Sequence, residues 1–123
     1  MAFKCLLFLV LLANFSAGFS VVIHFSNAVG SQAPINLRVR SNGYLTGSAL
    51  LRPLWVYEVE VDNNNNNEYS AHGVYGIAHS DFEAYEPTRD KGHANIYWRA
   101  DDWGFSFSYD NIEFERDAPW DSE

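Results

Sequence analysis

Apolar and polar residues alternate with a period of two along most of the chain after residue 20. The segment INLRVRS (35–41) places Ile35, Leu37 and Val39 on one face, and WVYEVEV (55–61) alternates in the same way with Trp55 on its apolar face. This period in β-branched and aromatic residues is typical of strands that bury one face. The same criterion predicts further strands at 21–26, 68–77, 81–86, 94–100, 104–110 and 112–117.

Residues with turn chemistry separate these predicted strands. Asn42-Gly43, Asp90-Lys91-Gly92 and Asp110-Asn111 contain the Asn, Asp and Gly residues that tight turns favour. About eight short strands at roughly even spacing predict one all-β domain over residues 21–123. We expect an antiparallel β-sandwich, with a barrel as the second choice.

The first twenty residues follow a different pattern. MAFKCLLFLVLLANFSAGFS begins with Lys4, continues as an apolar run from Cys5 to Ala13 and ends in small residues. These are the three regions of a secretory signal peptide, and the apolar run is shorter than the ~20 residues of a spanning helix. We expect cleavage near residues 18–20 and secretion of a chain that is not embedded in a membrane. A signal anchor is the alternative.

Charge and cysteine content limit the function classes further. Without Lys4, seven Lys and Arg residues remain against 16 Asp and Glu, a net charge of −9. This charge argues against nucleic acid and anionic membrane surfaces as partners. The one cysteine, Cys5, lies in the predicted signal peptide. The domain is therefore expected to be free of disulfides and to depend on its aromatic core for stability.

No group of residues indicates a catalytic centre, a metal site or a cofactor site. His72 and His79 could approach each other across a bend, but zinc would need a third ligand that the sequence does not identify. We expect these histidines at the surface or in loops, and the acidic pairs such as Asp101-Asp102 on solvated faces. With no nucleophile and base in a recognisable arrangement, we expect no enzymatic activity, no metal and no cofactor.

Tryptophans provide the candidate ligand contacts. Trp55 and Trp98 lie inside predicted strands and are expected in the core. Trp103 and Trp120 lie near a turn and near the C-terminus, so they are better candidates for exposure and for stacking on a sugar ring. The asparagine run 63–67 is expected to form an exposed loop, more typical of a variable solvated loop than of a recognition element.

The stretch FEAYEPTRDKGHANIYWRADDWGFSFS (82–108) resembles the C-terminal half of the plant self-incompatibility S1 proteins, also called S-protein homologues. It has the family's order of an aromatic pair, an Arg-Asp pair, a tryptophan strand and an acidic-Gly turn. The matching residues are Phe82, Tyr85, Arg89, Asp90, Trp98 and Gly104. The N-terminal half is similar more loosely, through VVIHFSN, INLRVRS and GSALLRPLWVYEVEV.

Two departures from the family pattern stand out. The family usually has four cysteines in two disulfides, and this chain has none after Cys5. Trp103 also separates Asp102 from Gly104, where the family usually keeps the acidic residue and glycine adjacent. Arg89 and Asp90 are expected to tie their turn to a neighbouring strand, and this structural role is favoured over a binding epitope.

The resemblance implies a secreted β-sandwich without known enzymatic activity that recognises a cell-surface receptor protein. The inter-strand loops are then the expected binding surface, with candidate contacts at Asn63, Asn65, Asn67, Lys91 and Trp103. The alternative is a cell-wall carbohydrate-binding module that uses Trp103 or Trp120.

Overall fold

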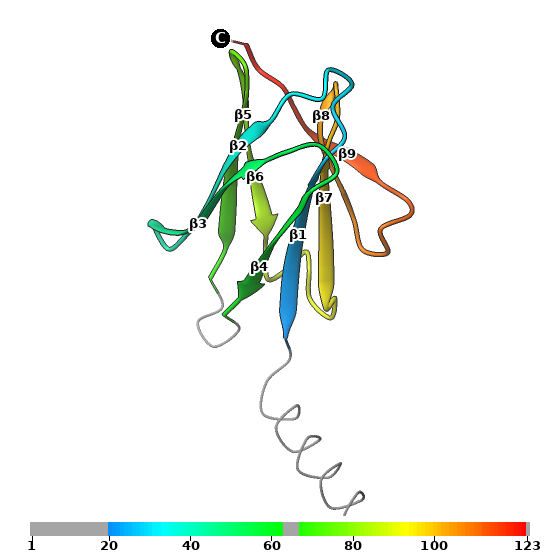
Figure 1. Cartoon of the computed structure of the whole chain (residues 1–123). Helices are drawn as coiled ribbons and strands as arrows, with labels where there is room; N and C mark the ends of the chain where they lie inside the picture. The colour runs from blue at the N-terminus through cyan, green and yellow to red at the C-terminus, as the bar shows by residue number, and fades with distance from the viewer. Residues whose placement is uncertain (1–19, 63–66, 123) are drawn as a thin grey trace, which may run out of the picture.

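The computed structural model describes residues 20–62 and 67–122, which form two β-sheets packed face to face (Figure 1). The strands are β1 Val21–Asn27, β2 Ile35–Ser41, β3 Tyr44–Leu51, β4 Val56–Val61, β5 Tyr69–Tyr75, β6 Ala78–Tyr85, β7 Asn95–Ala100, β8 Gly104–Ser108 and β9 Glu115–Pro119. One sheet has the order β4-β1-β7-β8-β9 and the other β3-β2-β5-β6. The predicted all-β sandwich is confirmed.

Some of the predictions lie outside the described residues. These are residues 1–19 of the predicted signal peptide and the candidate contacts Asn63 and Asn65. Within the part of the chain that the structure describes, no helix is long and apolar enough to cross a membrane.

Most strands lie where the alternation predicts them, because one face of each is buried. In β2, for example, Ile35, Leu37 and Val39 are buried and the residues between them are exposed. The additional strand β3 was not predicted. It lies at a sheet edge and most of its side chains are exposed on both faces, so its sequence shows no alternation.

The last strand begins later than predicted. The expected strand at 112–117 is wrong in its first half, because β9 begins at Glu115. The backbone N–H groups of Ile112 and Glu113 donate to the Asp110 carboxylate at 2.9 and 3.0 Å, in the turn that the Asp110-Asn111 pair predicted. This turn leaves Ile112 79% exposed instead of on a buried strand face.

One strand pair departs from the expected antiparallel arrangement. β1 pairs with β7 in parallel, with Val22 beside Asn95 and Asn27 beside Ala100. Every other pair within the two sheets is antiparallel. The chain between β1 and β7 includes β4 and the entire four-stranded sheet, so this long connection joins the two sheets.

The core between the sheets is aromatic. Trp98 and Phe105 are fully buried, and the Phe82 ring centroid lies 4.3 and 4.5 Å from theirs. Gly73 of β5 leaves the space that the Phe105 ring occupies, because a Cβ at residue 73 would stand 2.7 Å from that ring. The glycine that interrupts the β5 pattern therefore lets an aromatic ring from the other sheet approach the backbone.

Trp55 does not lie in the core, contrary to prediction. Trp55 is 58% exposed, because it precedes β4, which begins at Val56. The preceding Leu54 has φ of 67° in the turn before the strand, so the alternation of β4 does not continue back to residue 55. The Arg52 guanidinium carbon lies 5.7 Å from the centroid of the Trp55 ring, which provides a cation–π contact at the surface.

Candidate functional site

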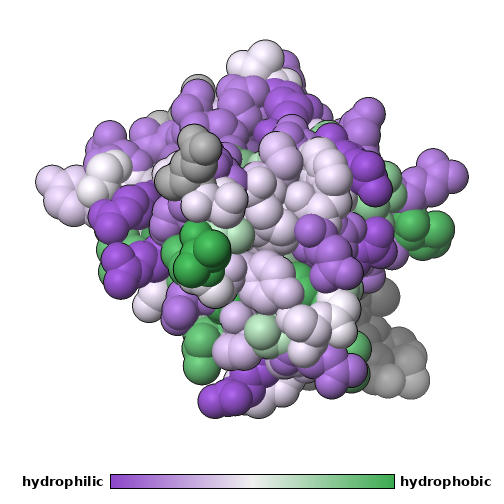
Figure 2. Space-filling view, turned by 90° about the horizontal axis from the view of Figure 1, so that it is seen from above, coloured by the Kyte–Doolittle hydropathy of each residue, from purple (hydrophilic) through white to green (hydrophobic). Residues whose placement is uncertain are grey.

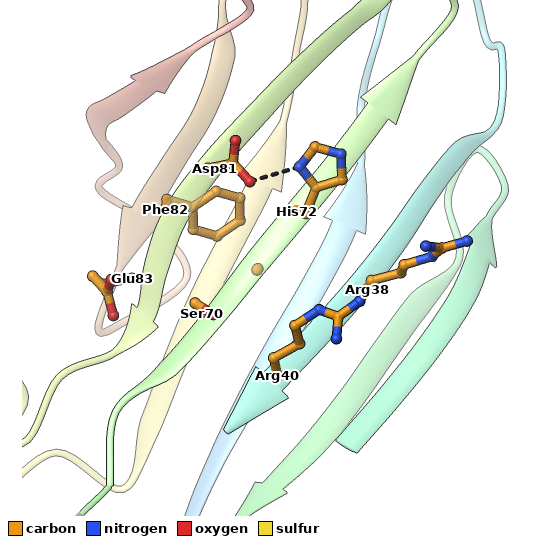
Figure 3. Close-up of a pocket in the computed structure, with 8 residues that line it drawn as sticks. Arg38, Arg40, Ser70, His72, Asp81, Phe82 and Glu83 are labelled. Atoms are coloured by element: carbon orange, nitrogen blue, oxygen red, sulfur yellow. Dashed lines mark hydrogen bonds and ion pairs between the residues drawn. The ribbon is translucent and has the colours of Figure 1, made fainter. Parts of the chain in front are cut away.

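The outer face of the four-stranded sheet has three adjoining depressions, which together we call the sheet face. The first is lined by Arg38 and Arg40 of β2 and by outward side chains of β5 and β6 (Figure 3). The second shares Arg38 and extends toward β3, and the third shares Arg40 and extends to Asn67. Shared lining residues make the sheet face one continuous surface.

Strand register brings these side chains together. His72 stands opposite Asp81 of β6 on one side and opposite Arg38 of β2 on the other. Alternate residues of a strand point to the same face of the sheet. A second row of outward side chains therefore lies two residues further along each strand. Opposed side chains in such rows are close enough to interact.

Two histidines and one carboxylate gather at the β5–β6 end of the sheet face. His72 Nδ1 lies 2.6 Å from Asp81 Oδ1, and His79 Nδ1 lies 4.0 Å from Asp81 Oδ2. The ring centroids of the two histidines are 5.9 Å apart. The sequence paired His72 with His79 but did not identify Asp81 as a third group. The register of the β5–β6 hairpin is the signal that could have identified it.

Glu83 lies in the same sheet face as Asp81, two residues further along β6. Partial burial raises the pKa of Glu83, and the nearby Glu68 carboxylate raises it further. The two acidic residues offset the positive charges of Arg38 and Arg40, so the sheet face has mixed charge.

The β6–β7 turn contains a buried ion pair. Asp90 is 1% exposed, and its carboxylate accepts hydrogen bonds from Arg89 Nε and Nη2 at 2.7 and 2.6 Å. It also accepts bonds from the Glu86 backbone N–H at 2.8 Å and from the Tyr109 hydroxyl at 2.6 Å. Tyr109 follows β8, so these bonds tie the turn to a neighbouring strand and support the structural role that the sequence favoured.

The ionisation of two of these groups depends on the pair. Burial raises the pKa of the Tyr109 hydroxyl to about 12, together with its hydrogen bond to Asp90. Burial acts to lower the pKa of Arg89, but the hydrogen bonds and charge of Asp90 outweigh it and raise that pKa. The guanidinium carbon also lies 5.7 Å from the centroid of the Trp98 ring, so Arg89 connects the turn to the core.

The other residues of the S1-like pattern are buried. Phe82 and Trp98 pack in the core, and Tyr85 contacts Tyr69 edge-on with ring centroids 6.1 Å apart. Gly104 has φ of 149°, and a Cβ there would overlap the Ala118 carbonyl oxygen of β9.

The predicted recognition residues that the structure describes lie at two opposite ends of the sandwich. Asn67 precedes β5 and lines the sheet face, and Lys91 is exposed in the β6–β7 turn at the same end. Trp103 lies in the β7–β8 turn at the other end (Figure 1). It is half-buried, with the Arg116 guanidinium carbon 5.1 Å from its ring centroid. One loop surface therefore cannot contain all of these residues.

Trp120 is not the exposed platform that its position near the C-terminus predicted. Its indole N–H donates to the Asp101 carbonyl oxygen at 2.7 Å, and its ring centroid lies 5.4 and 5.2 Å from those of Tyr75 and Phe105. Figure 2 views the molecule from above, at the end where the C-terminus lies. Hydrophobic side chains form separate clusters there in a mostly hydrophilic surface. Leu54 and Ile77 are among the exposed apolar residues, at 91% and 86%.

Comparisons with known proteins identify one similar fold. No protein-family model matches the sequence, and a search of curated proteins found no match. A solved structure is similar with a TM-score of 0.68 and 16% sequence identity, over 82% of this chain and 94% of the other. It is described as the structure of SPH (self-incompatibility protein homologue) proteins, a widespread family of small, highly stable, secreted proteins from plants. At this identity the similarity establishes the fold, and the chain has the β-sandwich fold of an SPH protein.

Proposed function

We propose that this protein is a secreted plant relative of the SPH proteins that recognises a cell-surface protein and has no enzymatic activity. The observation that carries the proposal is the fold similarity, which spans 94% of a protein described as secreted. The signal-peptide pattern of the first twenty residues also favours an extracellular location.

The recognition surface in this proposal is the end of the sandwich that carries Asn67 and Lys91. Loops on a rigid sheet scaffold often carry binding residues, since they vary without disturbing the core. The Asp90 ion pair holds the β6–β7 turn, so Lys91 projects from a fixed position next to a buried residue. Lys91 supplies a positive charge at this surface, which would pair with an acidic group of the partner.

The sheet face favours binding over catalysis. His72 and Asp81 are oriented as a base and its supporting carboxylate would be, but a nucleophile must also lie within hydrogen-bond reach of the base. Ser70 is two positions away on the same strand, a rise of about 6.6 Å, which is longer than a hydrogen bond.

Secretion and binding can be tested separately. Expression of the full chain in plant cells is expected to deliver protein to the medium with a new N-terminus near residues 19–21. The purified protein should bind saturably to intact plant plasma membranes, and protease treatment of the membranes should abolish binding. Retention of the uncleaved chain in the cells contradicts the proposed secretion. Absence of saturable binding contradicts the proposed recognition of a cell-surface protein.

A pair of charge-reversal variants locates the binding surface. Lys91→Glu is expected to weaken membrane binding because Lys91 lies at the proposed surface. Arg52→Glu makes the same charge change at the opposite end, in an exposed loop, and should leave binding unchanged. Equal effects of both substitutions would argue against the proposed surface.

A cell-wall carbohydrate-binding role is the second candidate, and the exposed Trp55 favours it. Its ring is available at the surface beside the Arg52 guanidinium, whereas Trp120 packs against the core. Aromatic rings with one accessible face are suited to stacking on sugars. Glycan-array binding that disappears in Trp55→Ala supports this role, and an array without hits removes it.

A further inference from the structure

We infer that His72, His79 and Asp81 form a binding site for a divalent transition-metal ion, with Zn²⁺ as the best-suited ion. The site lies on the outer side of the β5–β6 hairpin, at the edge of the sheet face. The inference rests on the geometry of these three residues and does not depend on secretion or on a receptor.

The three side chains already converge. One potential ligand atom from each residue lies within 4.8 Å of the other two. Figure 3 shows the His72 ring and the Asp81 carboxylate facing each other from neighbouring strands, 2.6 Å apart. Ligand atoms around tetrahedral Zn²⁺ are about 3.3 Å apart, given metal–ligand bonds of about 2.0–2.1 Å. No separation must therefore shorten by more than about 1.5 Å, and the 2.6 Å separation between His72 and Asp81 must lengthen by about 0.7 Å.

Side-chain rotations can supply these adjustments. The side chains of His72, His79 and Asp81 are 41%, 36% and 70% exposed, so the core does not lock their torsion angles. Their backbone positions, in contrast, are fixed by the hairpin. His72 pairs directly with Asp81, and His79 pairs with Val74 two residues nearer the turn. Sites built on strands are positioned more precisely than sites on loops, so the hairpin is a suitable basis for a metal site.

The ligand set selects the type of ion. Imidazole suits Zn²⁺, Cu²⁺ and Ni²⁺, whereas Ca²⁺ and Mg²⁺ prefer oxygen ligands alone. Two imidazoles and one carboxylate complete three positions of a tetrahedron and leave the fourth for water or for a side chain of a partner. An open fourth position would let the ion join this hairpin to a second protein.

The surrounding charges favour a cation on balance. Asp121 stands opposite His79 in an isolated bridge, which directs its side chain to the same side of the sheet. Glu83 adds a further carboxylate two residues from Asp81. Arg38, opposite His72 in β2, opposes binding as the neighbouring positive charge.

The two remaining histidines provide matched controls, because each belongs to a different local arrangement. His24 Nδ1 lies 2.6 Å from Glu58 Oε2, and the His24 ring stacks on the Tyr97 ring with centroids 4.5 Å apart. His93 stacks on the Tyr109 ring at 3.6 Å between centroids. If the ion bound to any histidine of the protein, substitution of His24 or His93 would also weaken Zn²⁺ binding. At the proposed site, neither substitution should change the affinity.

The test measures Zn²⁺ binding by the full chain, purified without a histidine tag, using equilibrium dialysis at pH 7.5. We expect one Zn²⁺ per chain, and no binding of Ca²⁺ or Mg²⁺ at the same concentration. His72→Gln and His79→Gln should each weaken binding at least about tenfold, and His24→Gln should not change it.

Two outcomes overturn the inference. One is the absence of bound Zn²⁺ at 100 µM free ion. The other is an affinity in His72→Gln and His79→Gln equal to that of the unmodified protein, which would place the ion elsewhere. If either glutamine variant fails to fold by circular dichroism, Asp81→Asn decides the question. Asp81 is exposed, so this change should retain the fold and still weaken Zn²⁺ binding at least about tenfold.

Discussion

Replacing Asp90 with alanine removes the acceptor of four hydrogen bonds in the β6–β7 turn. The Arg89 side chain is only 27% exposed, so its positive charge would remain partly buried without its partner. The Tyr109 hydroxyl would lose its closest acceptor, and the Glu86 N–H would lose its acceptor in the turn. The change should therefore destabilise the folded state through loss of an ion pair and of the bonds around it.

The expected cost follows from the burial of the pair. Removing one member of a buried ion pair costs about 3–5 kcal/mol. Because Arg89 keeps some contact with water, we expect the lower value, about 3 kcal/mol. This is a large share of the 5–15 kcal/mol that stabilises a typical domain. For a domain of about 100 residues it corresponds to a fall in Tm of about 12–24 °C.

Urea denaturation followed by tryptophan fluorescence measures this free energy. With an m-value of about 1.5 kcal/mol/M, a loss of 3 kcal/mol lowers the midpoint by about 2 M. Glu115→Ala removes an exposed carboxylate from β9 and should change stability by less than about 0.5 kcal/mol. The double variant Arg89→Met with Asp90→Asn removes both charges and should recover part of the loss, because no unpaired charge remains.

One result would refute the reasoning. If Asp90→Ala costs less than about 1 kcal/mol, the ion pair does not hold the turn. If the same variant also loses membrane binding while its stability is unchanged, Asp90 belongs to a binding epitope and the structural interpretation is wrong.

Three further predictions test other parts of the structure. Gly104→Ala should cost about 3 kcal/mol in urea denaturation, because its φ of 149° disfavours other residues and the new Cβ would overlap the Ala118 carbonyl. Trp55→Ala should change stability by less than about 0.5 kcal/mol, whereas Trp98→Ala should cost about 3–5 kcal/mol, and comparable losses would contradict their opposite burial. Absorbance titration at alkaline pH should show one tyrosine ionising near a pKa of about 12, absent in Tyr109→Phe. Because folding raises this pKa above the ordinary value of about 10, its contribution to stability is complete below pH 10 and is lost as the pH rises through 12.

The fold was predictable where one strand face is buried. β2 alternates cleanly because Ile35, Leu37 and Val39 face the core while the arginines between them face solvent. β3 was missed because an edge strand exposed on both faces has no reason to alternate. Trp55 was misplaced because alternation alone does not show where a strand begins, and the turn at Leu54 interrupts it.

The candidate site was only partly predictable, since it depends on contacts between strands. The proximity of His72 and His79 could be suggested from their spacing, but Asp81 joins them only through the β5–β6 register. The burial of Asp90 was also hidden, because an aspartate in a turn usually faces water. Its burial depends on donors that include Tyr109, 19 residues away in the sequence.

The parallel pairing of β1 and β7 has a consequence for the order in which the protein folds. β1 is an inner strand, bonded to β4 on one side and to β7 on the other (Figure 1). Asn95 follows its partner Val22 by 73 residues, so the sheet cannot close around β1 until most of the chain has been synthesised. Contacts over such separations slow folding, because a long loop must close before they form. The first strand to be made is therefore among the last to be fully paired.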